Sequence, residues 1–314
     1  STQSINTLEQ VELGGVRQWI SIRGHDVHNP VLLFLHGGPG SANLSLLRNQ
    51  CPELEEHLVI VNWDQRGAGK TYAATARDPL SIEQLVADTH ELVTHLKERF
   101  RVEKIHVMGF SWGTVPGLVV VDRYPGDFYA YLSLSQIVNG LEQERQSLEY
   151  VRQVARETGN QDALAELDGI DPSYQSADWY RQSMTQRKWL TRFGGVYHTR
   201  TTYSHEAMML FKASEYSLVD FAFWPLRSSH SLKQVWPEVM QIDFVETVPE
   251  VQVPVYFFVG RHDLNTPSVL IEGYFDQLNA PAGKDLVWFE ESAHSIRFDE
   301  PEKLAQEIIR IATE

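Results

Sequence analysis

The chain has 314 residues, 42% hydrophobic and 22% charged, which is the composition of a globular protein with a sizeable core. Its 27 basic and 42 acidic side chains give a formal net charge of -15, which argues against nucleic acid and anionic membranes as partners. No apolar stretch is long enough to span a bilayer, and the single cysteine, Cys51, excludes an internal disulfide and is typical of a reducing compartment. The first residues carry no basic-then-apolar signal, so we expect a cytoplasmic protein or one whose leader has been removed.

The first part of the chain predicts strands. Polar and apolar residues alternate over 5–23 around Gly14-Gly15, which indicates a β-hairpin at the edge of a sheet. Unbroken apolar runs follow at 31–36 and 58–63, and each ends in a glycine-rich loop. Such runs are typical of parallel strands that are covered on both faces.

The next elements alternate between helix and strand. Ser81 is expected to begin a helix, with a capping box to Gln84 and apolar residues at helical spacing behind it. Strands are predicted at 105–110 and 131–135, with a helix between them. This order indicates an α/β fold with a doubly wound, mostly parallel sheet.

From residue 139 the pattern changes. Apolar residues fall at helical spacing among many charges until a strand appears at 253–259. We therefore expect a core formed by 1–138 and 247–314, with an inserted, mainly helical cap domain over 139–246.

The tail resumes the core pattern. After the strand at 253–259 we expect a helix capped by Thr266 with Pro267 at its first position, then a strand at 286–289 and a last helix over 301–312.

One pentapeptide has the pattern of a catalytic serine. Gly109-Phe110-Ser111-Trp112-Gly113 joins a predicted strand to a predicted helix, where a serine nucleophile needs small residues two positions before and after it. Alone, the pattern also fits an ordinary turn. Asp263 and His294 follow two later strands, and the carboxyl ends of parallel strands meet at one edge of a sheet. The order Ser111, Asp263, His294 is that of a hydrolase triad of nucleophile, orienting acid and base.

The core resembles an α/β-hydrolase and, within that fold, the proline iminopeptidase (prolyl aminopeptidase) family. The similarity rests on His36-Gly37-Gly38-Pro39-Gly40, on Asp64-Gln65-Arg66-Gly67 and on the pentapeptide around Ser111. It implies a serine hydrolase that uses no cofactor. It also implies that the backbone N–H groups of Gly38 and Trp112 form the oxyanion hole.

The chain departs from the family's pattern at two places. Phe110 stands where the family usually has glycine, which is expected to reshape the site beside the nucleophile. The family's cap carries glutamates that bind the free amine of the substrate, and their motif cannot be aligned here. Glu215 and Glu206 are the nearest candidates for that role, although a carboxylate on a cap helix is more often a solvated charge.

Other residues favour structural roles. His36 and His262 are expected to hold loops, and the remaining histidines lack the spacing of a metal site. Gly67-x-Gly69-Lys70-Thr71 lacks the upstream glycine of a phosphate loop. An apolar group within the cap is expected to form mostly cap core, with a pocket lining as the alternative: Met208, Met209, Leu210, Phe211, Phe221, Phe223 and Trp224.

The sequence leaves three functions open. The first is an aminopeptidase that releases an N-terminal residue from small peptides or amides. The second keeps the triad but acts as an esterase, lactonase or amidase on a small acyl substrate. The third is a small-molecule binding protein without turnover. In each case the expected partner is a small molecule, with no nucleic acid, membrane or metal, and the oligomeric state is not determined by the sequence.

Overall fold

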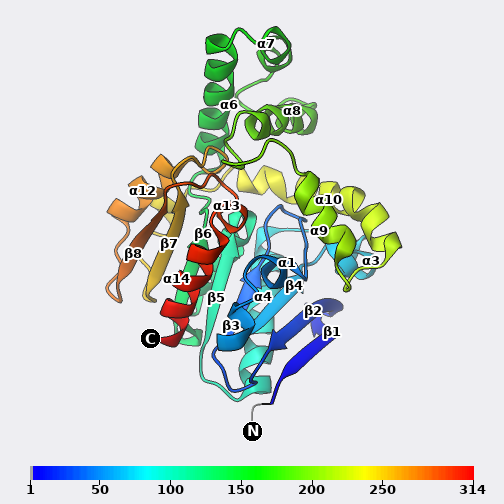
Figure 1. Cartoon of the computed structure of the whole chain (residues 1–314), viewed down its shortest axis with the longest axis vertical. Helices are drawn as coiled ribbons and strands as arrows, with labels where there is room; N and C mark the ends of the chain where they lie inside the picture. The colour runs from blue at the N-terminus through cyan, green and yellow to red at the C-terminus, as the bar shows by residue number, and fades with distance from the viewer. Residues whose placement is uncertain (1–2) are drawn as a thin grey trace.

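The computed structural model of the chain describes residues 3–314, which contain one eight-stranded sheet of order β1-β2-β4-β3-β5-β6-β7-β8 (Figure 1). Its strands are Ile5–Leu13 (β1), Val16–Gly24 (β2), Val31–Leu35 (β3), Val59–Asp64 (β4), Ile105–Phe110 (β5), Phe128–Leu134 (β6), Val255–Gly260 (β7) and Lys284–Phe289 (β8). β1 pairs antiparallel with β2, and β2 with β4; all other neighbouring strands are parallel. The predicted α/β class with a mostly parallel sheet is confirmed.

The hairpin at the start of the chain is confirmed. Gly14 and Gly15 both have positive φ, 57° and 75°, which is the backbone that a two-residue turn matched to the strand twist requires. Leu13 pairs with Val16 directly across this turn.

Helices cover both faces of the sheet. The principal helices of the core are Leu46–Gln50 (α1), Leu54–His57 (α2), Ile82–Phe100 (α4), Thr114–Arg123 (α5), Ser268–Gln277 (α12) and Pro301–Thr313 (α14), with the short Tyr72–Thr75 (α3) and Ile296–Asp299 (α13) in loops. α4, α5 and α12 pack with one set of alternating strand residues, including Leu33 and Val107. α1, α2 and α14 pack with the opposite set, including Leu32 and Met108. None of the helices in the described part of the chain is both long and apolar enough to cross a membrane.

Two predicted helix caps differ from the structure. Ser81 does cap α4, because its hydroxyl accepts from the backbone N–H of Gln84 at 3.1 Å, but the Gln84 side chain donates to Asp88 instead of closing the capping box. α12 begins at Ser268, one residue later than expected, with Pro267 as its N-cap. The hydroxyl of Thr266 is instead used to hold Asp263.

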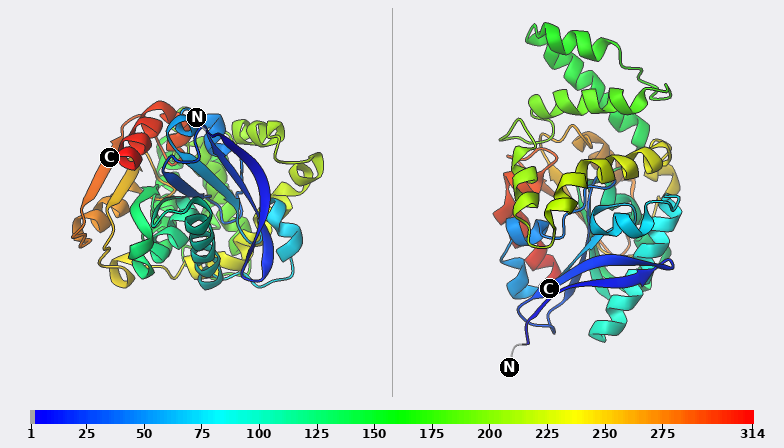
Figure 2. Two further views of the ribbon diagram at one scale, coloured as in Figure 1. Left: turned by 90° about the horizontal axis from the view of Figure 1, so that it is seen from below. Right: turned by 90° about the vertical axis from the view of Figure 1, so that its right-hand side faces the viewer.

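The segment between β6 and β7 is helical, as predicted. It contains Gly140–Glu157 (α6), Gln161–Asp168 (α7), Trp179–Arg192 (α8), Ser204–Lys212 (α9), Leu218–Val239 (α10) and Phe244–Thr247 (α11). Figures 1 and 2 show α6, α7 and α8 projecting beyond the sheet, with α9 and α10 nearer to the core. The base of the segment is closed by a bridge between Asn139 and Asp243. Its division from the core as a separate domain stays a prediction.

Polar contacts tie the helical segment to the core strands. The Tyr216 hydroxyl donates to Asp64 at 2.7 Å, at the end of β4, and accepts from the backbone N–H of Leu44. The Glu215 carboxylate receives two hydrogen bonds from Arg48, at 2.6 and 2.9 Å. The loop that precedes α10 is therefore held at a fixed position over the carboxyl ends of the strands.

Because the start of α5 is closely packed, we expect a methyl group added at Gly113 to lower the stability of the fold. A Cβ at Gly113 would lie 2.0 Å from the Leu35 carbonyl oxygen, whereas a Cβ at Gly126 would contact nothing. We expect Gly113→Ala to lower the free energy of unfolding by at least about 3 kcal/mol, because backbone must move to relieve the overlap. Gly126→Ala is the matched control. Urea unfolding curves measure both, and equal stability of the two variants would contradict the packing described.

The buried Asp64 predicts a pH dependence of stability. Burial raises the pKa of Asp64 to about 7, although the hydrogen bond from Tyr216 opposes this shift. The folded chain then binds a proton between about pH 4 and 7 that the unfolded chain has lost, so stability due to this group falls as the pH rises through that window. We expect the stability difference between wild type and Asp64→Asn to fall by up to about 1.4 kcal/mol per pH unit there. Unfolding curves at pH 5, 6, 7 and 8 test this, and a pH-independent difference contradicts it.

Candidate active site

Ser111 lies at the sharp turn from β5 into α5. Its φ is 50°, a left-handed conformation that is costly for a residue other than glycine. A Cβ at Gly109 would lie 2.4 Å from the Gly113 carbonyl oxygen, so the turn can form only with glycine at both positions. The Ser111 carbonyl accepts from the Thr114 hydroxyl at 2.6 Å, which fixes the first turn after the serine.

Ser111, His294 and Asp263 form one hydrogen-bonded chain. His294 Nε2 lies 2.9 Å from Ser111 Oγ, and His294 Nδ1 lies 3.0 Å from Asp263 Oδ2. The loops after β7 and β8 bring the acid and the histidine to the serine, as the sequence order predicted. The Ser135 hydroxyl donates to the His294 carbonyl at 2.9 Å and so anchors the histidine loop to the end of β6.

Asp263 is fully buried and held as a hydrogen-bond acceptor. Its Oδ1 accepts from the backbone N–H groups of Asn265 and Thr266, each at 2.9 Å, and its Oδ2 accepts from the Thr266 hydroxyl at 2.8 Å. With the carboxylate fixed, the His294 ring has one favoured orientation, with Nδ1–H donating to Asp263 and Nε2 free to accept from Ser111.

The loop after β3 approaches the serine from the other side. Gly38, with a φ of 122°, lines the cavity above Ser111. His36 is buried behind this loop: its Nδ1 donates to the Gly37 carbonyl at 2.8 Å and its Nε2 accepts from the backbone N–H of Gln65. Burial lowers the pKa of His36 to about 4, so it is neutral and structural, in accord with the loop-holding role expected for it.

Trp112, directly after the nucleophile, is fully buried. Its indole N–H donates to the Gln65 side chain at 3.0 Å, which locks the side chain under the loop after β4. The backbone of Trp112 begins the helical turn that leads into α5. Backbone N–H groups at such a helix start are available to an anion.

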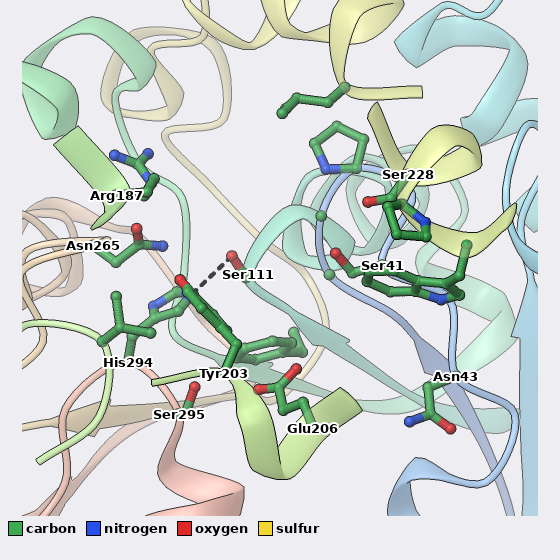
Figure 3. A pocket seen from close by; sticks show the side chains of 18 of the residues that line it. Ser41, Asn43, Ser111, Arg187, Tyr203, Glu206, Ser228, Asn265, His294 and Ser295 are labelled. Carbon is green, nitrogen blue, oxygen red and sulfur yellow. Dashed lines mark hydrogen bonds between the residues drawn. The ribbon is translucent and has the colours of Figure 1, made fainter. Parts of the chain in front are cut away.

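A cavity of about 610 Å³ opens above Ser111, which is within the size range of small-ligand sites (Figure 3). The core and the helical segment both contribute to its walls. Most of its lining is apolar or aromatic, and includes Leu46, Ile137, Trp179, Met184, Val196, Leu210, Phe221, Trp224, Leu232 and Trp236.

Phe110 lines this cavity next to the nucleophile and is clamped by two neighbours. Its ring centroid lies 5.2 Å from that of the His294 ring, and the Arg297 guanidinium lies 3.9 Å from the Phe110 centroid. Arg297 is only 4% exposed, and its Nε and Nη1 have no hydrogen-bond partner among residues 3–314. Phe110 therefore forms a rigid wall, not a mobile side chain, on one side of Ser111.

The two glutamates considered from the sequence lie in different surroundings. Glu206 lines the cavity; its Oε1 accepts from Arg297 at 2.9 Å and from the Tyr197 hydroxyl, while its Oε2 accepts no hydrogen bond from the described chain. Glu215 does not line the cavity, and both of its oxygens are engaged by Arg48. Only Glu206 is thus presented to a ligand.

The apolar group of the helical segment is divided between cavity and surface. Leu210, Phe221 and Trp224 line the cavity, whereas Met208 and Phe211 are half-exposed. The expectation that most of this group forms a buried core is therefore wrong, because α9 and α10 have apolar residues on both of their faces.

Several polar residues of the site were not predicted from the sequence. Arg187, Asn265 and Arg297 line the cavity, and Arg187 pairs with the buried Glu144 behind it. Arg297 lies three residues after His294, and Asn265 two residues after Asp263, so proximity to the triad loops was the available signal. Arg187 is far from these motifs in sequence and had none.

Residues 30–301 match the family model described as alpha/beta hydrolase fold, so the chain belongs to the α/β-hydrolase family. Within that family it resembles the prolyl aminopeptidases. It is 30% identical to a protein named probable aminopeptidase YbaC of Bacillus subtilis, over 99% of this chain and 97% of that one.

Two further similarities agree with this placement. The chain is 22% identical to a proline iminopeptidase of Heyndrickxia coagulans over 87% of both chains. A solved structure of a proline iminopeptidase-related protein from Thermus thermophilus superposes with a TM-score of 0.68, at 20% identity, over 98% of both chains. At that identity the superposition bears on the fold alone. The protein is a hydrolase of this fold.

Proposed function

We propose that the protein is a serine hydrolase that releases an N-terminal residue from small peptides or amides through an acyl-enzyme. The single observation that carries the proposal is the hydrogen-bonded chain Ser111–His294–Asp263, of which Ser111 and His294 line the cavity. A serine, a base and an orienting acid in this geometry are the parts that acyl transfer needs.

In the first half of the reaction, Ser111 Oγ attacks the carbonyl carbon while His294 Nε2 takes its proton. Asp263 keeps the histidine in the required tautomer and stabilises the imidazolium that forms. The backbone N–H groups of Gly38 and Trp112 are assigned to the oxyanion. Each such donor contributes about a hundred- to a thousandfold in rate, because it is already oriented in a site from which water is excluded.

In the second half, His294 gives the proton to the leaving amine, and the bond between the carbonyl carbon and that amine breaks. A water molecule, deprotonated by His294, then hydrolyses the acyl-enzyme and frees Ser111. The helical segment closes over the cavity, so a short peptide can enter while a folded protein is excluded.

Glu206 is assigned to the substrate's free amine. It is a partly buried carboxylate with one oxygen held by Arg297 and Tyr197 and the other unoccupied by the described chain. An ammonium group is a strong partner for such an oxygen. The name of the Bacillus subtilis relative, a probable aminopeptidase, supports the same assignment.

A panel of anilides tests the proposed activity. We expect proline and alanine 4-nitroanilides with a free amine to be hydrolysed, and their amine-blocked forms to be hydrolysed at least about tenfold more slowly, because the blocked forms lose the charge that Glu206 binds. Release of 4-nitroaniline is followed by absorbance. Equal rates for free and blocked forms would reject the aminopeptidase assignment.

Glu206→Gln tests the amine site itself. The amide keeps an oxygen for Arg297 and removes the negative charge, so kcat/KM for the free-amine anilide should fall about 10- to 100-fold, mainly through KM. Glu149→Gln, at an exposed position on α6, is the control and should match wild type. If Glu206→Gln retains full kcat/KM, the amine is bound elsewhere.

A second candidate is an esterase, lactonase or amidase on a small acyl substrate. It is favoured by the charge compensation of both glutamates, since Glu206 pairs with Arg297 and Glu215 with Arg48. The largely apolar lining also suits an uncharged acyl group. Fast hydrolysis of short 4-nitrophenyl esters without any anilide hydrolysis would favour this candidate over the first.

A further inference from the structure

The charged residues in the cavity lining are arranged as two separate groups. Apart from His294, the charged lining residues among 3–314 are Glu206, Arg297 and Arg187. Glu206 and Arg297 are joined to each other by a hydrogen bond of 2.9 Å. Arg187, on α8, belongs to a different pair, whose carboxylate Glu144 is fully buried on α6.

Some N–H donors of the Arg187 guanidinium are not used by its ion pair. Two of its five N–H groups reach Glu144, one of them at 2.9 Å, and the other three have no hydrogen-bond partner among residues 3–314. Glu144 does not line the cavity, whereas Arg187 does and is 17% exposed. The pair therefore presents its cationic member to the cavity and keeps its anionic member behind the wall.

Glu144 is fixed in that position by neutral partners. The Gln186 amide donates to the Glu144 backbone carbonyl at 3.0 Å and to its carboxylate at 3.3 Å, and the Gln186 side-chain oxygen accepts from the Tyr174 hydroxyl. Because α6 and α8 are joined in this way, the Arg187 side chain is held in place before any ligand arrives. A guanidinium in a fixed position suits a planar carboxylate.

The position of Arg187 relative to Ser111 indicates which part of the substrate lies near this arginine. Figure 3 shows Arg187 and Asn265 on the side of Ser111 where His294 lies, and Glu206 on the other side. His294 delivers its proton to the leaving amine, so the leaving group is the part of the substrate that lies toward Arg187 and Asn265. Glu206 is on the side left for the acyl part and its amine.

We propose that the preferred substrates are free dipeptides, bound as zwitterions, with Arg187 as the residue that binds the C-terminal carboxylate. This inference rests on the proposed aminopeptidase function. In a dipeptide the leaving group is an amino acid, whose carboxylate is attached to the same carbon as the departing amine. Asn265, which also lines the cavity, supplies an amide N–H to the same carboxylate.

Formation of the acyl-enzyme from a dipeptide needs no reactant besides the substrate and Ser111. The peptide C–N bond breaks as the ester bond to Ser111 Oγ forms, and the serine proton passes through His294 to the departing amine. The leaving amino acid keeps its carboxylate throughout, so Arg187 binds the same charge in the substrate and in the first product. Arg187 is thus a specificity-determining residue and takes no part in proton transfer.

The experiment compares alanyl-alanine with alanyl-alanine amide, which differ in the C-terminal charge, and uses alanine 4-nitroanilide to report the proposed function. We expect wild type to show a kcat/KM about 10- to 100-fold higher for the free dipeptide than for its amide, mostly through KM, as the loss of one charge-assisted hydrogen-bonded contact implies.

Two variants separate substrate binding from the structural ion pair. Glu144→Gln removes the pair but keeps the guanidinium, so the preference for the free dipeptide should be retained or increased. Glu144→Gln combined with Arg187→Gln leaves no buried charge unpaired, and the preference should fall to about onefold. Arg181→Gln, an exposed arginine on the same helix, is the matched control and should behave as wild type.

The outcomes separate dipeptide specificity from the proposed aminopeptidase activity. Hydrolysis of the anilide together with equal rates on the two dipeptide forms in wild type overturns this inference alone. So does an unchanged preference in the double variant. Hydrolysis of neither the anilide nor either dipeptide form overturns the proposed function, and this inference with it.

Discussion

The site depends on how closely the start of α5 approaches β3 and β5. Gly113 lies against the Leu35 carbonyl and Gly109 against Gly113, so no side chain fits at either position. This contact forces Ser111 into its left-handed conformation at the end of β5. The strain is stabilised by the surrounding sheet, and its result is a serine hydroxyl that projects into the cavity toward His294.

Charge compensation shapes the rest of the cavity. The chain carries a formal net charge of -15, yet three carboxylates of the helical segment are each paired with an arginine: Glu144 with Arg187, Glu206 with Arg297 and Glu215 with Arg48. A buried carboxylate without a partner would lower the stability of the folded chain. Removing one member of such a pair would leave the other charge buried and unpaired. Arg187 lines the cavity while its partner Glu144 does not, whereas Glu206 and Arg297 both line it.

Much of the fold followed from the sequence, because buried parallel strands are short apolar runs that end in glycine-rich loops. The placement of Ser111, Asp263 and His294 at strand ends followed from the same reasoning, and the structure brings their side chains within hydrogen-bond distance. The start of α12 was not predicted correctly, because the Thr266 hydroxyl donates to Asp263 and does not cap the helix. Arg187 carried no local signal, because its role arises from the packing of α8 on α6, which a single sequence does not encode in any short motif.

Covalent labelling shows whether Ser111 is the nucleophile. On treatment with a fluorophosphonate, we expect one adduct per chain by intact mass, located at Ser111 by peptide mapping and absent from Ser111→Ala. The geometry at His294 Nε2, 2.9 Å from Ser111 Oγ, is what makes this hydroxyl more reactive than the other serines. An unlabelled wild-type protein, or an adduct of equal yield in Ser111→Ala, would contradict the assignment of Ser111 as the nucleophile.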